Sequence, residues 1–131
     1  MRKSFGTVLN CIDGRTQIPV INWIKENFDV EYVDLITEPG MDKIVSEGNP
    51  FYSSRLKNKI SISVKAHKSK IIGLVGHYDC AANPVDAEVH YRQIEEATNL
   101  IKNWNFSVDT IVGLWVDEFW EVHVVSLYKR I

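Results

Sequence analysis

Hydrophobic residues along the chain fall into short β-branched runs and longer segments in which they recur at helical spacing. The short runs predict strands at residues 7–11, 30–36, 70–76, 109–116 and 120–127. The longer segments predict helices at residues 16–27, around residues 56–67, and at residues 84–103. Strands that alternate with helices indicate an α/β fold with helices on both faces of the sheet. We therefore expect a mainly parallel sheet of about five strands, in which the short link between the last two strands makes an antiparallel edge.

Local signals set the expected ends of these elements. Thr16 is expected to cap the first helix, after a turn dipeptide at residues 13–14. Asn83 followed by Pro84 is typical of a cap and a first helical position. The last helix is expected to bury one face, formed by Ala87, Tyr91, Ile94, Thr98 and Ile101. Between the second strand and the second helix, a Pro-Gly turn at residues 39–40 and a loop at residues 47–50 are expected.

Residues 60–64 are ambiguous, because they alternate like a strand. The same segment also places apolar and small residues on one helical face, and most of its lysines fall outside that face. We favour the helix because the segment leads directly into the run at residues 70–76. That run is nearly all apolar, as expected for a parallel strand covered on both faces.

Composition narrows the class of protein. The chain has 131 residues and a formal net charge of -2, which predicts one domain over residues 1–131 and argues against a dedicated nucleic-acid binder. Residues 1–3 contain a basic pair, as the start of a signal peptide does, but the apolar run that follows is too short for one. No stretch approaches the roughly 20 apolar residues of a membrane span. We expect a soluble cytoplasmic protein that binds neither nucleic acid nor a membrane.

Three residues of metal-ligand type fall at the expected ligand edge of the sheet. Cys11 ends the first strand, and His77 and Cys80 directly follow the strand at residues 70–76. The carboxyl ends of parallel strands line the ligand crevice of such sheets. The His-x-x-Cys spacing allows both side chains to project to one side of a tight turn. One histidine and two cysteines suit Zn²⁺ and leave its fourth position open.

Asp13 and Arg15 complete the candidate site. Asp13 lies two residues beyond Cys11, so its carboxylate could be a fourth metal ligand or accept a hydrogen bond from water on the metal. Arg15 could hold that carboxylate in a bidentate pair, which predicts a switch between the two states. Zinc lowers the pKa of bound water to about 7 and so supplies hydroxide. The plainer interpretations are that Asp13 only stabilises the turn and that the cysteines are ordinary core residues.

Two motifs resemble those of the β-class carbonic anhydrase family. Residues 11–15 match C-x-D-x-R, and residues 76–82 match G-H-x-x-C followed by small residues. The resemblance implies a carbonate dehydratase-type zinc lyase that hydrates CO₂ to bicarbonate. By this resemblance Cys11, His77 and Cys80 are zinc ligands. Asp13 is then the fourth ligand or the proton acceptor, and Arg15 is the partner of Asp13. It also implies a homodimer.

Residues 37–41 depart from the turn that this family usually has after its second strand. Two other functions therefore stay open: a carbonic anhydrase-like zinc-binding protein without CO₂ turnover, and a hydrolase of a related small substrate such as COS or CS₂.

The other histidines and nearby carboxylates receive simpler interpretations. Imidazole groups can shuttle protons near neutral pH, but no spacing ties His67, His90 or His123 to the site, so we interpret them as surface or helix-face residues. Asp79 is expected in a turn or as a helix cap, and Glu38 in a solvated loop.

Overall fold

Across residues 4–130, which the computed structural model describes, the chain forms a five-stranded sheet with the order β2-β1-β3-β4-β5. The strands are β1 (Phe5–Asn10), β2 (Tyr32–Thr37), β3 (Ile71–His77), β4 (Thr110–Val116) and β5 (Val122–Lys129). The first four strands are parallel, and β5 pairs antiparallel with β4. The predicted fold class is confirmed. The basic start at residues 1–3 lies outside the described residues.

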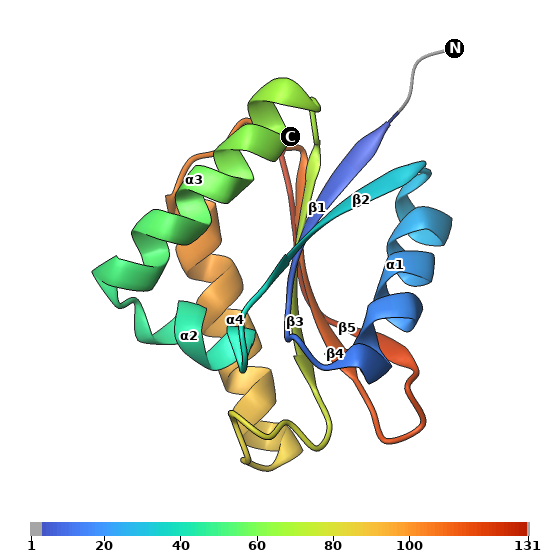
Figure 1. Ribbon diagram of the computed structural model, residues 1–131, viewed down its shortest axis with the longest axis vertical. Coiled ribbons are helices and arrows are strands. Elements are labelled where there is room, and N and C mark those ends of the chain that lie inside the picture. The colour runs from blue at the N-terminus through green and yellow to red at the C-terminus, as the bar shows by residue number, and fades with distance from the viewer. Residues whose placement is uncertain (1–3, 131) are drawn as a thin grey trace.

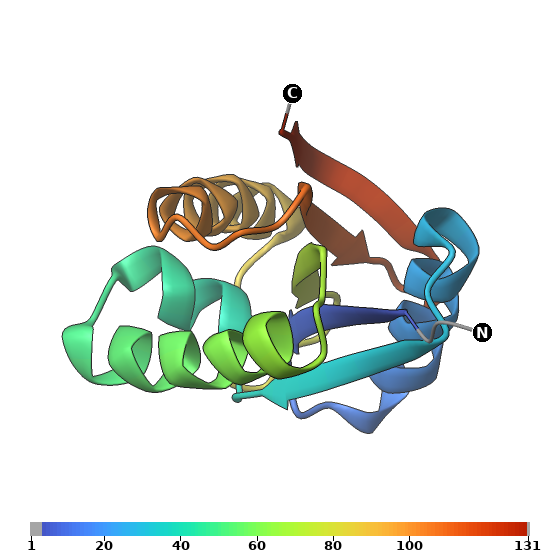
Figure 2. The ribbon, with the colours of Figure 1, turned by 90° about the horizontal axis from the view of Figure 1, so that it is seen from above.

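Helices cover both faces of the sheet (Figures 1 and 2). On one face lies α1 (Gly14–Phe28), and the other carries α2 (Met41–Glu47), α3 (Pro50–Ala66) and α4 (Ala87–Asn103). Every residue of β3 and β4 is buried, as the apolar run at residues 70–76 predicted. No helix within residues 4–130 has the length and apolar character needed to cross a membrane.

Two hydrophobic clusters, one on each face, hold the layers together. Because successive strand residues point to opposite faces, Val8 packs with Val20 and Ile24 of α1, whereas Leu9 packs with the helices of the other face. The cluster on the face covered by α2, α3 and α4 is the larger of the two, since three helices contribute to it. Its fully buried side chains include Leu9, Met41, Leu56, Ile60, Ile72, Leu74, Ile94 and Ile101.

The predicted start of the first helix is wrong by about two residues. Asp13, not Thr16, is the cap, because its carboxylate accepts a hydrogen bond from the backbone N–H of Arg15. Thr16 is fully buried inside the first turn, and its hydroxyl donates to the carbonyl oxygen of Asp13 at 2.8 Å. The helix therefore begins directly after the turn that follows Cys11.

The predicted start of the last helix is also wrong. α4 begins at Ala87, where the carboxylate of Asp86 accepts from the N–H of Val89 at 3.1 Å. Asn83 is buried and its side chain is bonded elsewhere. The buried face of α4 contains His90 and Ala97, whereas Tyr91 remains 37% exposed.

The region between β2 and β3 contains more helix than predicted. A seven-residue helix, α2, follows the turn at Gly40, and α3 already begins at Pro50, with Asn49 as its cap. The helical interpretation of residues 60–64 is confirmed. At the other end of the chain β5 begins at Val122 rather than at residue 120, because Trp120 lies in the turn with a φ of 62°.

Candidate metal centre

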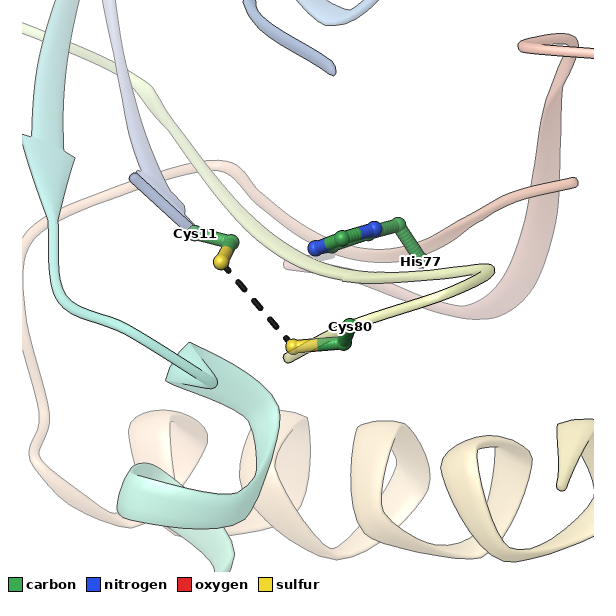
Figure 3. A group of neighbouring side chains, drawn as sticks. All are labelled: Cys11, His77 and Cys80. Carbon is green, nitrogen blue, oxygen red and sulfur yellow. Dashed lines mark hydrogen bonds between the residues drawn. The ribbon is translucent and has the colours of Figure 1, made fainter. Parts of the chain in front are cut away.

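Cys11, His77 and Cys80 meet at the carboxyl edge of the sheet (Figure 3). Cys11 is the first residue after β1 and His77 is the last residue of β3, and these two strands are parallel neighbours. Cys80 lies in the turn that follows, where Asp79 adopts a left-handed φ of 57°. One ligand atom from each of the three residues lies within 4.8 Å of the other two. All three residues are buried.

The geometry and chemistry of this group fit a zinc ion. The two sulfur atoms lie 4.0 Å apart, and two sulfurs bound to one tetrahedral zinc are about 3.8 Å apart. Nδ1 of His77 donates to the carbonyl oxygen of Tyr78 at 2.7 Å. That bond fixes the tautomer in which Nε2 carries the lone pair, and Nε2 is buried without a hydrogen-bond partner. A buried, unpartnered acceptor beside two sulfurs is what a metal-ligating imidazole requires.

A hydrogen bond links the two sulfurs. The Cys80 thiol donates to Cys11, which lowers the pKa of Cys11 despite the opposing effect of burial. The same bond, together with burial, raises the pKa of Cys80. Burial lowers the pKa of His77, but the Cys11 sulfur, the Tyr78 carbonyl and the Asp13 charge together raise it by more, so the net pKa of His77 is raised. A divalent cation at this point would take the place of the proton between the sulfurs.

Cys11 is held by groups that sequence reasoning missed. Oδ1 of buried Asn10 accepts from the N–H of Cys11, and Nε2 of Gln17 donates to the Cys11 carbonyl oxygen, each at 2.8 Å. The backbone N–H groups of Gly40 and Asp13 donate to the Cys11 sulfur. Gly40 has a φ of 66°, and a Cβ there would lie 3.3 Å from Ala82. The Pro-Gly turn at residues 39–40 was the available signal, but nothing in it indicated a sulfur contact.

Arg15 ties Asp13 to the turn between His77 and Cys80. Its Nη2 and Nε bond the two carboxylate oxygens of Asp13 at 2.7 and 3.1 Å. Its guanidinium also bonds the Asp79 carboxylate at 3.2 Å and lies 4.6 Å from the ring centre of Trp120. The hydrogen bonds from Arg15 lower the pKa of Asp13 to about 2. The predicted Asp13–Arg15 pair is thus formed, and Asp79 does more than shape a turn.

Asp13 is not one of the three residues whose ligand atoms converge. Its carboxylate is bound to Arg15 and caps α1, so the structure has Asp13 in the arginine-held arrangement. Its proposed place as a fourth metal ligand stays a prediction. Glu38 is partly exposed, and its backbone N–H donates to the Asn10 carbonyl at 3.2 Å.

The remaining histidines each pair with a carboxylate. The exposed positions predicted for His67 and His123 are confirmed; they bond Asp34 and Asp117, each at 2.6 Å. His90 lies on a helix face, as one of the two interpretations had it, but on the buried face of α4, because its side chain is only 1% exposed.

A second group, Asp117, Glu121 and His123, lies in the β4–β5 hairpin. Oδ1 of Asp117 accepts from the N–H groups of Phe119 and Glu121, and Oδ2 bonds Nε2 of His123. These bonds close the turn between the two strands. They give both oxygens of the Asp117 carboxylate a protein partner, so its position is explained without a bound metal ion.

We expect His123→Ala to raise the pKa of Asp117 towards its unfolded value of about 3.9, because the hydrogen bond from His123 is the largest cause of its lowering. A carboxylate with a lowered pKa stabilises the folded chain above its unfolded pKa, and that stabilisation is lost as pH falls through the folded value. Carbon-13 NMR titration of the Asp117 carboxyl measures the shift. His67→Ala is the control, since His67 bonds Asp34 instead; equal titration of Asp117 in both variants would contradict the assignment.

Comparisons with solved structures agree with the fold. One of two tetrameric β-carbonic anhydrases from Sordaria macrospora is similar with a TM-score of 0.64 and 14% identity, over 96% of this chain and 83% of that chain. A carbonic anhydrase from Glaciozyma antarctica has a TM-score of 0.62 and 14% identity, over 95% and 83%. The β-carbonic anhydrase isoform I of Trichomonas vaginalis has a TM-score of 0.58 and 14% identity, over 95% and 82%.

No curated protein matches the chain by sequence at a significant level. A family profile described as "Putative carbonic anhydrase" matches residues 1–126. The resemblance read from residues 11–15 and 76–82 is thereby confirmed. With the profile spanning nearly the whole sequence and the fold shared with β-carbonic anhydrases, the chain belongs to this carbonic anhydrase family.

Proposed function

We propose that Cys11, His77 and Cys80 bind Zn²⁺ and that the chain hydrates CO₂ to bicarbonate. The observation that carries the proposal is the meeting of three buried ligand atoms, one of them the unpartnered Nε2 of His77. Zinc bound there would act as a Lewis acid that supplies hydroxide near neutral pH. The names of the similar solved structures support this chemistry over other uses of the fold.

In this proposal Asp13 and Arg15 act on the substrate side of the site. The Asp13 carboxylate orients the attacking group as a hydrogen-bond acceptor or takes its proton at an Oδ atom. Arg15 holds both Asp13 oxygens, so it sets where that acceptor lies. When Arg15 releases it, Asp13 can become the fourth ligand. The further contacts of Arg15 with Asp79 and Trp120 favour the held arrangement.

Metal analysis coupled to a stopped-flow hydration assay tests the proposal. We expect close to one zinc per chain and CO₂ hydration that increases from neutral to alkaline pH. If the zinc-loaded chain hydrates CO₂ no faster than buffer over that range, turnover is excluded and only metal binding remains.

Burial of the centre favours a second candidate, a zinc-binding protein without CO₂ turnover. His77 is 1% exposed and Cys80 is 3% exposed, as in a closed structural site. Removing the metal would then lower the melting temperature strongly while no hydration appears. Hydrolysis of COS or CS₂ by the zinc-loaded chain would instead identify a related small substrate.

Exposed apolar side chains support association of the chain with a second copy. Ile12 and Tyr78, beside the metal-ligand candidates in sequence, and Phe119, beside Trp120 in the β4–β5 turn, are 58%, 47% and 74% exposed. We propose a cytoplasmic homodimer in which residues 1–131 act as a single zinc-binding domain. Sedimentation velocity would show a dimer, and a monomer at micromolar concentration would exclude it.

A further inference from the structure

A buried polar cluster lies behind the metal centre, where α2 packs against α4 (Figure 1). Oδ2 of Asp42 bonds Nδ1 of His90 at 2.6 Å, and the two side chains are 2% and 1% exposed. The amide of buried Asn83 donates to Oδ1 of Asp42 at 3.1 Å and to Gln93 at 2.7 Å. Replacing such a buried pair by apolar residues is often neutral or stabilising. Its presence here therefore calls for a reason beyond stability.

The cluster sits directly against the strand that delivers His77. A Cβ atom added at Gly76 would lie 2.4 Å from Oδ2 of Asp42 and 2.9 Å from Ile94. Only a glycine therefore leaves room for the carboxylate beside β3. The glycine of the G-H-x-x-C motif thus admits Asp42 one residue before a metal-ligand candidate.

Asn83 connects the cluster to Cys80. The backbone N–H groups of Ala82 and Asn83 donate to the Cys80 sulfur, and the N–H of Asn83 also lies 3.2 Å from the Cys80 carbonyl oxygen. The side chain of Asn83 is meanwhile fixed by Asp42 and Gln93. The Asp42 carboxylate therefore holds the side chain of one of the two residues whose N–H groups donate to Cys80.

One N–H donor to Cys11 lies two residues before Asp42 in the chain. Asp42 is the second residue of α2, and Gly40, the cap of that helix, donates its N–H to the Cys11 sulfur. A Cβ on Gly40 would touch Ala82, so the turn before α2 lies against the turn after Cys80. One buried group thus braces the two segments that donate hydrogen bonds to the sulfurs.

We propose that Asp42, held by His90 and tethered to Asn83, is a positioning residue for the two cysteine ligands of the metal. It does not touch the metal; it keeps the N–H groups of Gly40, Ala82 and Asn83 aimed at the sulfurs. Hydrogen bonds to ligand atoms orient them and tune the metal, and losing such support typically lowers metal affinity about 10–100-fold. The inference rests on the metal site of the proposed function.

Zinc affinity and the absorption spectrum of the Co²⁺-loaded protein test this role. We expect Asp42→Ser and Asn83→Ala to weaken zinc binding about 10–100-fold in competition with a chromophoric chelator. The sulfur-to-cobalt charge-transfer bands should shift, because the sulfurs lose their fixed orientation. Asp42→Asn keeps an acceptor for Asn83 and should restore part of the affinity. Measurements are made well below each variant's melting temperature.

Thr98→Val, on the helix α4 that also carries His90, is the matched control. Its hydroxyl is also buried, but it bonds Ser126 of β5 rather than the sulfur-bearing turns. We expect it to change the melting temperature without changing zinc affinity or the cobalt spectrum. A merely structural Asp42 would behave in the same way.

Three outcomes separate the possibilities. Wild-type protein that binds neither zinc nor cobalt overturns the proposed function itself. Wild-type protein that binds both, with Asn83→Ala unchanged in affinity and spectrum, overturns only the positioning role. Should Asp42→Ser fail to fold, Asn83→Ala and His90→Gln decide the question, since each removes a single bond to the carboxylate.

Discussion

Cys80→Ser is expected to abolish stable zinc binding. A serine hydroxyl does not ionise near neutral pH, so the variant loses one of three protein ligands. The zinc affinity should therefore fall by more than the roughly 100-fold that a supporting group contributes. Zinc per chain after dialysis and chelator competition measure the loss, and CO₂ hydration should disappear with the metal.

Ala81→Ser is the control for this experiment. It introduces the same hydroxyl one residue later, at an exposed position of the same turn. The control should keep zinc near one per chain, which would show that Cys80→Ser acts through the lost sulfur and not through a disturbed turn. Cys80→Ser protein that retains zinc with wild-type affinity would mean that the ion, if present, is held elsewhere.

The meeting of Cys11 with His77 could be predicted because it depends on topology more than on detail. Two apolar runs at residues 7–11 and 70–76 identified strands, and parallel strands bring their carboxyl ends to one edge. The order of the strands confirms this, since β1 lies between β2 and β3 and pairs with β3 in parallel. Errors of one or two residues at the strand ends did not matter, because the ligands follow the strands directly.

Helix starts were less predictable because one dipeptide can serve two purposes. Asn49-Pro50 begins α3, with the Asn49 side chain accepting from the next N–H along the helix. Asn83-Pro84 presents the same signal, yet α4 begins three residues later. The amide of Asn83 is bonded to Asp42 and Gln93 instead. A long-range partner therefore overrides the local preference, and a sequence pattern does not reveal that partner.

The buried cluster behind the site was missed for the same reason. Asp42 and His90 are 48 residues apart in sequence. They lie on two different helices, and no local pattern in either segment indicates that the two side chains meet. α2 is also only seven residues long, too short for a clear helical period. The glycine at residue 76 was read as part of a family motif. Nothing in that motif indicates that the missing side chain makes room for Oδ2 of Asp42.

Gly76→Ala is therefore expected to lower both the stability of the chain and its affinity for zinc. Its Cβ would lie 2.4 Å from Oδ2 of Asp42 and 2.9 Å from Cδ1 of Ile94, both buried. Overpacking of this kind typically lowers the free energy of unfolding by about 1–3 kcal/mol. The displaced carboxylate should also carry Asn83 with it, so zinc affinity should fall along with the melting temperature.

Gly6→Ala separates this effect from the ordinary consequence of adding a methyl group to a strand. Gly6 is buried in β1, but its Cβ would meet Ile24 and Val30 at 3.6 and 3.7 Å, which is normal contact. We expect that variant to melt near the wild-type temperature and to bind zinc normally. Thermal denaturation with and without zinc compares the two variants. If Gly76→Ala melted like Gly6→Ala, the carboxylate would have room to move, and the close packing of Asp42 against β3 could not be what fixes the position of Asn83.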